Sequence, residues 1–205
     1  MSLNTIEYWL GWAGAAALVP FLGAALLGIA RGLSRPRGRA TGLARQVLRP
    51  AAYLFIDVGF FGLCILLWRP LPISLSALVR SVALALGALL YFPGLALYLW
   101  AWQTLGEMYD VSSSLGAQLY ANHRLITRGP FAVIRHPMYL GLILAAAGGL
   151  SIYRTWTFVF VSISFLGLVL RARREEQALA AEFGQAWQAY CQRVPGWIPR
   201  LPKPR

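Results

Sequence analysis

The stretch "MYLGLILAAAGGLSIYRTWTFVFVSISFLGLVL", residues 138–170, decides how the second half of this chain folds. It is apolar on both sides of Arg154, and each apolar side is sixteen residues long. One helix of this length would exceed the thickness of a bilayer, whereas two slightly short helices fit one crossing each. The stretch therefore predicts a helical hairpin that turns at Arg154. Because a hairpin brings its ends together, Arg135 and His136 should lie near residues 171–176.

Composition places the whole chain in the membrane class. Hydrophobic residues make up 58% of it and charged residues only 13%, which is more apolar surface than one soluble core would bury. Further apolar runs at 8–30, 51–68 and 78–102 have the length of membrane-crossing helices. We therefore predict an all-α polytopic membrane protein with about five transmembrane helices, the last two being the hairpin. A cytoplasmic C-terminal amphipathic helix would follow them.

The basic residues predict an orientation. The net charge is +12, but the basic residues gather between apolar runs, which is typical of topology signals and not of nucleic-acid contacts. With five spans, sixteen basic residues fall on one side and only Arg69, Arg80 and Arg154 on the other. The positive-inside rule then puts the C-terminus in the cytoplasm and the N-terminus outside, where Glu7 has no basic neighbour in the sequence. Lys203 is the only lysine among the basic residues, and such a bias toward arginine is typical of the codon usage of a GC-rich genome. This favours a bacterial source and therefore a bacterial inner membrane.

The motif "RHPMY", residues 135–139, precedes the first arm of the hairpin. Pro137 suits the first turn of a helix, where its missing N–H costs nothing. The free amides and the dipole of such a helix start favour an anion, which Arg135 would reinforce. Alternatively, Arg135 only marks the interface, and His136 and Tyr139 are interfacial amphipathic side chains.

The motif "RARREE", residues 171–176, follows the second arm. Glu175 stands four residues after Arg171, which is the spacing of an ordinary surface ion pair on a helix. Two acids beside three arginines, at the point where the last span reaches water, would also receive an ammonium or a hydroxyl group. Both interpretations stay open on these residues alone.

Other polar and aromatic residues carry weaker signals. Asp57, in the middle of the second span, is either functional or simply protonated or hydrogen-bonded to another helix. Phe183, Trp187 and Tyr190 have helical spacing and predict an amphipathic helix lying at the interface. The cysteines and histidines lack the spacing of metal ligands, so no metal site is predicted.

Taken together, the motifs resemble the integral-membrane methyltransferases of the isoprenylcysteine carboxyl methyltransferase and phospholipid N-methyltransferase type. The matching pieces, within residues 105–199, are "LGEMYDVSSS", "HRLITRGPFAVIRHPMYLG", "RREEQALAAEFGQAWQAY" and "RVPGWIP". No GxGxxG or P-loop motif is present, so a Rossmann-type domain is not expected. The resemblance implies a cofactor-binding core at 103–205, preceded at 1–102 by three transmembrane helices that face substrate and lipid.

The resemblance also implies the cofactor S-adenosylmethionine, bound at the cytoplasmic end of the helices. Its carboxylate would suit Arg135, and its ammonium would suit a glutamate of the second motif. Its adenine would lie against aromatic groups of the tail. The implied cofactor-binding residues are Arg135, His136, Pro137, Tyr139, Gly141, Glu175, Glu176, Trp187 and Tyr190.

The implied reaction is displacement at the sulfonium methyl by a hydrophobic or lipid-like acceptor, an isoprenylcysteine carboxylate by resemblance. The protein would mainly align the reactants and exclude water. A carboxylate acceptor needs only a cation to place it, and the candidate catalytic residues are Arg171, Arg174 and Glu176. An amine or thiol acceptor would need a base, for which the candidates are Glu107, Asp110 and His123.

Two alternatives remain. Sterol reductases of the same superfamily bind NADPH in a similar C-terminal pocket, and "WQAYCQRVP" resembles their tail as well. The chain could also be a catalytically silent membrane scaffold. The expected partners are membrane lipids and the acceptor, without nucleic acid or metal.

Overall fold

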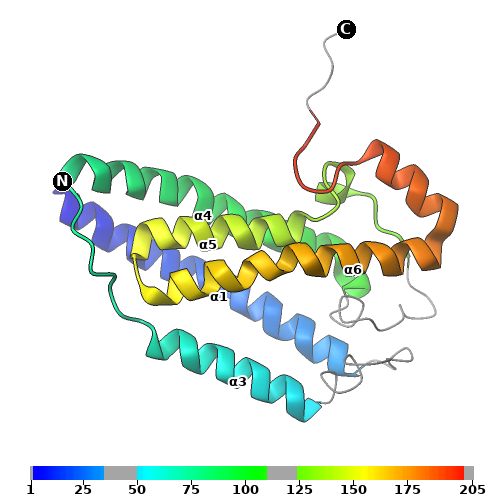
Figure 1. Cartoon of the computed structure of the whole chain (residues 1–205), viewed down its shortest axis with the longest axis horizontal. Helices are drawn as coiled ribbons and strands as arrows, with labels where there is room; N and C mark the ends of the chain where they lie inside the picture. Colours follow the sequence, from blue (N-terminus) through cyan, green and yellow to red (C-terminus); the bar gives the residue numbers. More distant parts are fainter. Residues whose placement is uncertain (1, 35–49, 110–123, 201–205) are drawn as a thin grey trace, which may run out of the picture.

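The computed structural model describes residues 2–34, 50–109 and 124–200. Within these residues every regular element is helical (Figure 1). The α-helices are α1 (Leu3–Ser34), α3 (Pro50–Leu66), α4 (Ala77–Leu105), α5 (Pro137–Tyr153) and α6 (Trp156–Arg193). Two short 3₁₀ turns, η1 (Gly106–Met108) and η3 (Gly129–Ala132), flank the gap at 110–123.

The predicted hairpin is present as α5 and α6. Helix α5 ends where Arg154 takes a left-handed conformation with φ 47°, and its N–H donates to the Leu150 carbonyl at 3.0 Å. The turn is held by the segment after α3, because the Leu71 N–H donates to the Arg154 carbonyl at 2.7 Å. Figure 1 shows α5 and α6 running side by side from this turn.

The predicted tail helix is present but partly buried. The element labelled α6 consists of two helices joined at Gly184, where the backbone is not helical, and the second helix ends at Arg193. Its position at a membrane interface stays a prediction. Gly184 has φ 47° and ψ −116°, a conformation that side-chain-bearing residues rarely adopt. Beyond this break the chain turns back over the end of the bundle, and Trp187 and Tyr190 are buried.

Helices α4 and α5 pack with their backbones in contact. A Cβ on Gly148 would lie 2.4 Å from the Tyr91 nitrogen and 2.6 Å from the Gly87 carbonyl oxygen. One heptad earlier, a Cβ on Gly141 would lie 2.6 Å from the Gly94 carbonyl oxygen. Close approach through small residues is how helices associate in lipid, where no hydrophobic force draws them together. This seam fixes the start of α5 relative to α4.

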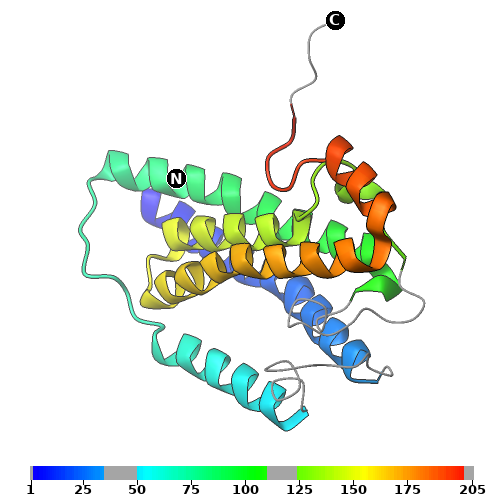
Figure 2. The ribbon, with the colours of Figure 1, turned by 45° about the vertical axis from the view of Figure 1, so that its right-hand side comes forward.

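Helix α1 is attached to this pair by tyrosine hydroxyls. The hydroxyl of Tyr91 donates to the Gly14 carbonyl at 3.1 Å, and that of Tyr153 donates to the Gly11 carbonyl at 2.8 Å. Helix α3 contacts α6 near the C-terminal end of α3, where the Thr157 hydroxyl donates to the Cys64 carbonyl at 2.6 Å. Both helices therefore lie outside the α4–α5–α6 centre (Figures 1 and 2).

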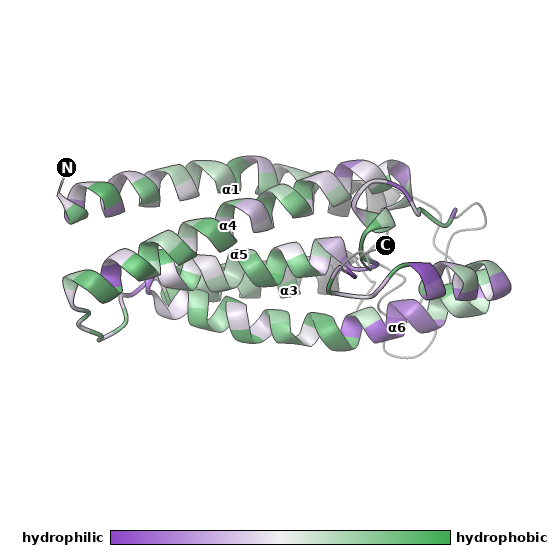
Figure 3. Ribbon diagram, turned by 90° about the horizontal axis from the view of Figure 1, so that it is seen from above, coloured by the Kyte–Doolittle hydropathy of each residue, from purple (hydrophilic) through white to green (hydrophobic). Residues whose placement is uncertain are grey.

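The outer faces of the helices are apolar. Large side chains such as Val19, Phe55, Leu89 and Ile163 are exposed on four different helices. Figure 3 shows hydrophobic residues along the length of the bundle and hydrophilic ones gathered on the second half of α6. Among the described residues, Ala77–Met108 and Trp156–Arg193 are long and apolar enough to cross a membrane, and Pro137–Tyr153 is a shorter apolar helix. These features confirm an all-helical fold and fit a membrane protein, while the count of five spans and their orientation stay predictions.

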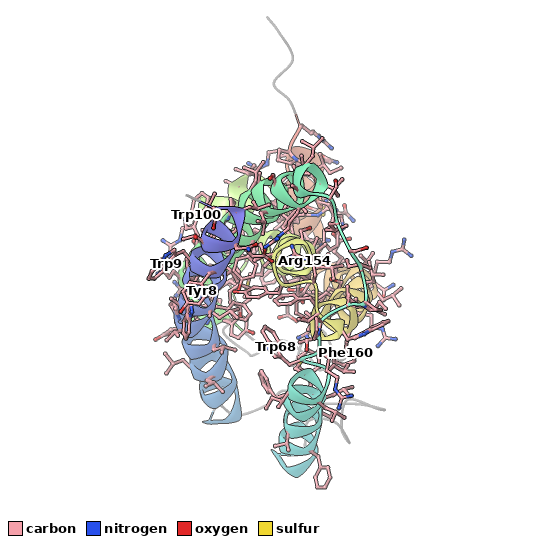
Figure 4. All side chains as sticks on the ribbon, turned by 90° about the vertical axis from the view of Figure 1, so that its left-hand side faces the viewer. Tyr8, Trp9, Trp68, Trp100, Arg154 and Phe160 are labelled. Carbon is pink, nitrogen blue, oxygen red and sulfur yellow. The ribbon has the colours of Figure 1, made fainter. Side chains whose placement is uncertain are left out.

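The end of the bundle that carries the N-terminus holds an ion-pair cluster. Glu7, which has no basic neighbour in the sequence, forms salt bridges with both Arg80 and Arg154. Arg80 also donates to the Asn4 side-chain oxygen at 2.7 Å. Figure 4 looks at this end and shows Arg154 among the helices, whereas Trp9 lies at the outer edge. The cluster therefore ties the start of α1 to α4 and to the hairpin turn.

Replacing Glu7 with glutamine should destabilise the fold. Two arginines that share one carboxylate would then face each other, and losing charged hydrogen bonds of this kind costs about 2 kcal/mol. We expect a lower melting temperature of the purified protein in detergent. The matched control is Glu182→Gln, since Glu182 is an exposed glutamate on α6. An equal effect of both variants would contradict the structural role of Glu7.

Candidate functional site

A cavity of about 160 Å³ lies at the other end of the bundle, and α4, α5, α6 and the segment around residue 125 surround it. A single water needs roughly a tenth of this volume, so the space admits an organic ligand. Its polar lining is Tyr98, Tyr109, Arg124, Arg135, His136, Tyr139, Arg171, Glu175 and Tyr190. Its apolar lining includes Leu105, Met108, Leu125, Ile126, Phe131, Leu142, Leu168, Leu179 and Trp187. One cavity thus combines charged groups, aromatic rings and an apolar wall.

The turn before α5 aims the first motif into this cavity. Pro130 and Phe131 are buried in η3, which anchors the turn, and Gly129 supplies a positive φ of 60°. His136 is the N-cap of α5 and Pro137 is its first residue, as the sequence predicts. As a result Arg135 and His136 leave the turn together toward α6.

Arg135 and His136 meet Glu176, which confirms the predicted meeting of the two ends of the hairpin. The Arg135 guanidinium lies 2.9 Å from Glu176 Oε1, and His136 Nε2 lies 2.8 Å from the same oxygen. The His136 side chain is buried, with only 4% of it exposed, so its ring depends on this partner.

The pKa of the Glu176 carboxyl reflects this pairing. Glu176 lies beyond the apolar part of α6, which ends at Leu170. The hydrogen bond to His136, and then the charge of Arg135, lower this pKa even though partial burial opposes them. Glu176 is therefore a carboxylate at neutral pH. Its stabilising contribution is lost only as the pH falls through this lowered pKa.

Arg135 and His136 also bind the C-terminal segment. The Arg135 guanidinium donates to the carbonyls of Cys191 at 3.4 Å and Val194 at 3.2 Å. The backbone N–H of Arg135 donates to the Pro195 carbonyl at 2.9 Å, and that of His136 donates to the Gly196 carbonyl at 3.1 Å. Much of the donor capacity that the sequence assigned to a ligand's carboxylate is thus used within the protein.

A second polar group lines the cavity beside this cluster. The Tyr139 hydroxyl donates to Glu175 Oε2 at 2.9 Å, and the Arg171 guanidinium carbon lies 5.9 Å from the centre of the Tyr139 ring. Tyr98 from α4 and Tyr109 line the same cavity. A cation, a carboxylate and phenol hydroxyls therefore converge on one side of the cavity.

The remaining predicted residues are placed differently. Gly141 lies in the α4–α5 seam and not in the cavity lining, and Arg174 is an exposed residue outside that lining. Glu107 is exposed in η1. Asp110 and His123 fall outside the described residues, and of Asp57 only its position in α3 is described. Among the described residues, no group of three His, Cys, Asp or Glu side chains is arranged to hold a metal ion.

Sequence reasoning missed Tyr98, Tyr109 and Trp197. Tyr98 is buried, although it sits in an apolar run that reads only as a membrane span. The Trp197 ring lies 5.2 Å from the His136 ring, at the end of "RVPGWIP". In the sequence, Tyr98 is a single hydroxyl-bearing residue within an apolar helix, and such a residue most often packs against neighbouring helices. The sequence therefore did not point to it as a site residue.

Comparison with known proteins adds an independent observation. Residues 85–181 match the isoprenylcysteine carboxyl methyltransferase (ICMT) family. The chain is ICMT-like. The match includes the RHPMY and RARREE motifs, so it covers both groups that meet in the cavity.

Individual relatives carry two kinds of name. Protein-S-isoprenylcysteine O-methyltransferase of Schizosaccharomyces pombe is 34% identical over 87 residues, which are 40% of this ICMT-like chain and 35% of that protein. Protein-S-isoprenylcysteine O-methyltransferase B of Arabidopsis thaliana is 24% identical over 187 residues, or 78% of this chain and 95% of that one. Delta(14)-sterol reductase TM7SF2 of Mus musculus is 39% identical over 75 residues, or 35% of this chain. The chain spans only 18% of the length of that reductase.

Proposed function

We propose that this ICMT-like protein transfers the methyl group of S-adenosylmethionine to a hydrophobic or lipid-like acceptor, with an isoprenylcysteine carboxylate as the first candidate. The observation that carries this proposal is the cavity in which the two matched motifs meet. We place the reaction at the cytoplasmic face of a bacterial inner membrane, following the distribution of the basic residues.

The cavity has the chemistry that this cofactor requires. Glu175 and the hydroxyl of Tyr139 suit the ammonium group of this cofactor. Trp187 and Tyr190 offer aromatic faces for an adenine. Arg135, His136 and Glu176 would support this ligand from the edge of the cavity, where they are hydrogen-bonded to one another.

The bound cofactor would supply a methyl group on a sulfonium, which is already a good leaving group. The residues of this chain would then orient the acceptor and exclude water. Arg171 would hold an anionic acceptor oxygen, and Leu142 and Leu168 would pack against its apolar part. A carboxylate acceptor is already deprotonated, so no general base is required.

A second function is favoured by one observation. The identity with the mouse sterol reductase, 39% over 75 residues, is higher than that with either methyltransferase relative. An NADPH-dependent reductase would use the same cavity for a larger, more negatively charged cofactor. A catalytically silent scaffold would bind neither cofactor.

Ligand titration separates these functions. S-adenosylmethionine and S-adenosylhomocysteine should raise the melting temperature of the detergent-purified protein, because a ligand at one hundred times its Kd stabilises the folded state by about 2.7 kcal/mol. NADPH should have no effect, and an unrelated nucleotide such as GTP serves as the control. Stabilisation by NADPH alone would replace the proposed methyltransferase with a reductase. No response to any of them would favour the scaffold.

A further inference from the structure

The C-terminal part of α6 is joined to the rest of that helix through one glycine in a non-helical conformation. Gly184 has φ 47° and ψ −116°, and a Cβ placed there would meet nothing within 4 Å. The break is therefore made by backbone conformation and not by packing around the glycine. Residues 185–197, which we call the lid, turn back from this point over the end of the bundle (Figures 1 and 2).

The lid forms one wall of the cavity. Trp187 and Tyr190 line it and are buried, with 6% and 3% of their surfaces exposed. On the other side of the cavity the lining comes from α5 and from α6 before the break, including Tyr139 and Arg171. A ligand that fills the cavity therefore contacts both the bundle and the lid, and it binds best when the lid is closed.

Both apolar and polar contacts hold the lid in this position. Trp187, Tyr190 and Val194 form a buried cluster against Leu125, Leu179 and Phe183. The Tyr190 hydroxyl donates to the Phe131 carbonyl at 2.6 Å. Arg135 and His136 hold the carbonyls of residues 191, 194, 195 and 196 through their side-chain and backbone donors. The Arg135 guanidinium also lies over the Trp187 ring, 5.8 Å from its centre. The polar contacts described here all come from residues 131–136, which precede α5.

Glu176 holds Arg135 and His136 in place. It lies on α6 before the break, and one of its oxygens receives both Arg135 Nε at 3.0 Å and His136 Nε2 at 2.8 Å. Neighbouring Glu175 instead accepts a hydrogen bond from the Tyr139 hydroxyl. Two adjacent glutamates thus have separate partners, one toward the lid and one toward the cavity.

We propose that residues 185–197 form a hinged lid that opens at Gly184 to admit ligands, and that Arg135, His136 and Glu176 are positioning residues that keep it closed. The lid closes over the cavity whichever cofactor occupies it. Only the statement that S-adenosylhomocysteine closes it further rests on the proposed function.

Cys191 provides a reporter for this opening. The chain has two cysteines, so Cys64→Ala leaves a half-buried thiol within the lid as the single labelling site. Alkylation of that thiol by a bulky maleimide should follow the open population when the lid recloses faster than it is labelled. In the full chain, Glu176→Gln should speed labelling about tenfold, as expected for the loss of hydrogen bonds to a charged group. Glu175→Gln is the matched control and should leave the rate in the absence of ligand unchanged.

A second variant and a second measurement guard against unfolding. Tyr190→Phe removes the bond to Phe131 without touching the charged cluster, and it should also speed labelling. Hydrogen exchange should rise in residues 185–197 of both variants and stay unchanged in α5, whereas global unfolding would raise both and would overturn the proposal for that variant. Equal labelling of Glu176→Gln, Tyr190→Phe and Glu175→Gln would show that the lid does not open as a unit.

The effect of a ligand on the labelling rate is measured separately. S-adenosylhomocysteine should slow labelling of Cys191 in the Cys64→Ala protein at least severalfold. If it has no effect while Glu176→Gln still speeds labelling, the lid stands and the proposed cofactor is wrong. If neither changes the rate, the lid itself is wrong.

Discussion

Replacing Gly148 with alanine should prevent α4 and α5 from packing and should strongly destabilise the protein. The added Cβ would lie 2.4 Å from the backbone nitrogen of Tyr91 and 2.8 Å from its Cα. Backbone atoms inside a helix pair cannot move aside as a flexible side chain can, so the helices would have to separate. Overpacking of a tight core costs roughly 1–3 kcal/mol, and we expect the upper end of this range or more. The fraction of monodisperse protein after heating in detergent measures the effect.

The matched control is Gly167→Ala, which makes the same change in another apolar helix. A Cβ at Gly167 meets nothing within 4 Å, and alanine is a better helix former than glycine by about 1 kcal/mol. This variant should therefore be as stable as the wild type or more stable. If Gly148→Ala tolerated heating as well as Gly167→Ala does, the close α4–α5 seam would be incorrect.

The hairpin could be predicted because its signals are local. Pro137 and Arg154 bound an apolar run, and α5 spans Pro137–Tyr153, within one residue of the expected start. The meeting of Arg135 and His136 with Glu176 then followed from connectivity alone, since a tight hairpin has no other place for its ends. Likewise, the basic residues assigned to one side include Arg80 and Arg154, which do meet at one end of the bundle.

The use of each charged group could not be predicted in the same way. A motif with a cation and an acid looks alike whether the two bind a ligand or bind each other. In the structure Arg135 is hydrogen-bonded to Glu176 and to the tail carbonyls, whereas Glu175 faces the cavity. Gly141 follows the first motif closely. The sequence alone does not distinguish a glycine that permits close contact between helices from a glycine that makes room for a cofactor.

The break at Gly184 was hidden for a related reason. A glycine within an amphipathic pattern is usually tolerated at a small cost, and only its dihedral angles show that the helix turns there. The periodic aromatic residues Trp187 and Tyr190 then indicated an amphipathic helix lying at the interface, and only the resemblance assigned them to a cofactor. Their burial against the cavity depends on that turn and on contacts with a turn more than fifty residues earlier in the chain.

Replacing Arg171 with alanine should abolish most of the proposed methyl transfer. Arg171 lines the cavity beside Tyr139 and Glu175, where it would hold the acceptor oxygen against the methyl group. Removing one charged group that positions a reacting oxygen typically lowers kcat by about 100-fold. Formation of S-adenosylhomocysteine from S-adenosylmethionine, with a small isoprenylated cysteine derivative as acceptor, measures the loss. Because the defect concerns the acceptor, kcat/KM for the acceptor should fall while S-adenosylhomocysteine affinity changes much less.

Arg173→Ala is the matched control for Arg171→Ala. It removes an arginine from the same helix two residues later, so it changes the net charge equally, but Arg173 is exposed and outside the cavity lining. Its activity should stay within about twofold of the wild type, as for most surface substitutions. Equal losses in both variants would point to the general positive charge of this face, for example in binding an anionic membrane. A large loss of S-adenosylhomocysteine affinity in Arg171→Ala alone would instead assign Arg171 to the cofactor, because the acceptor takes no part in that measurement.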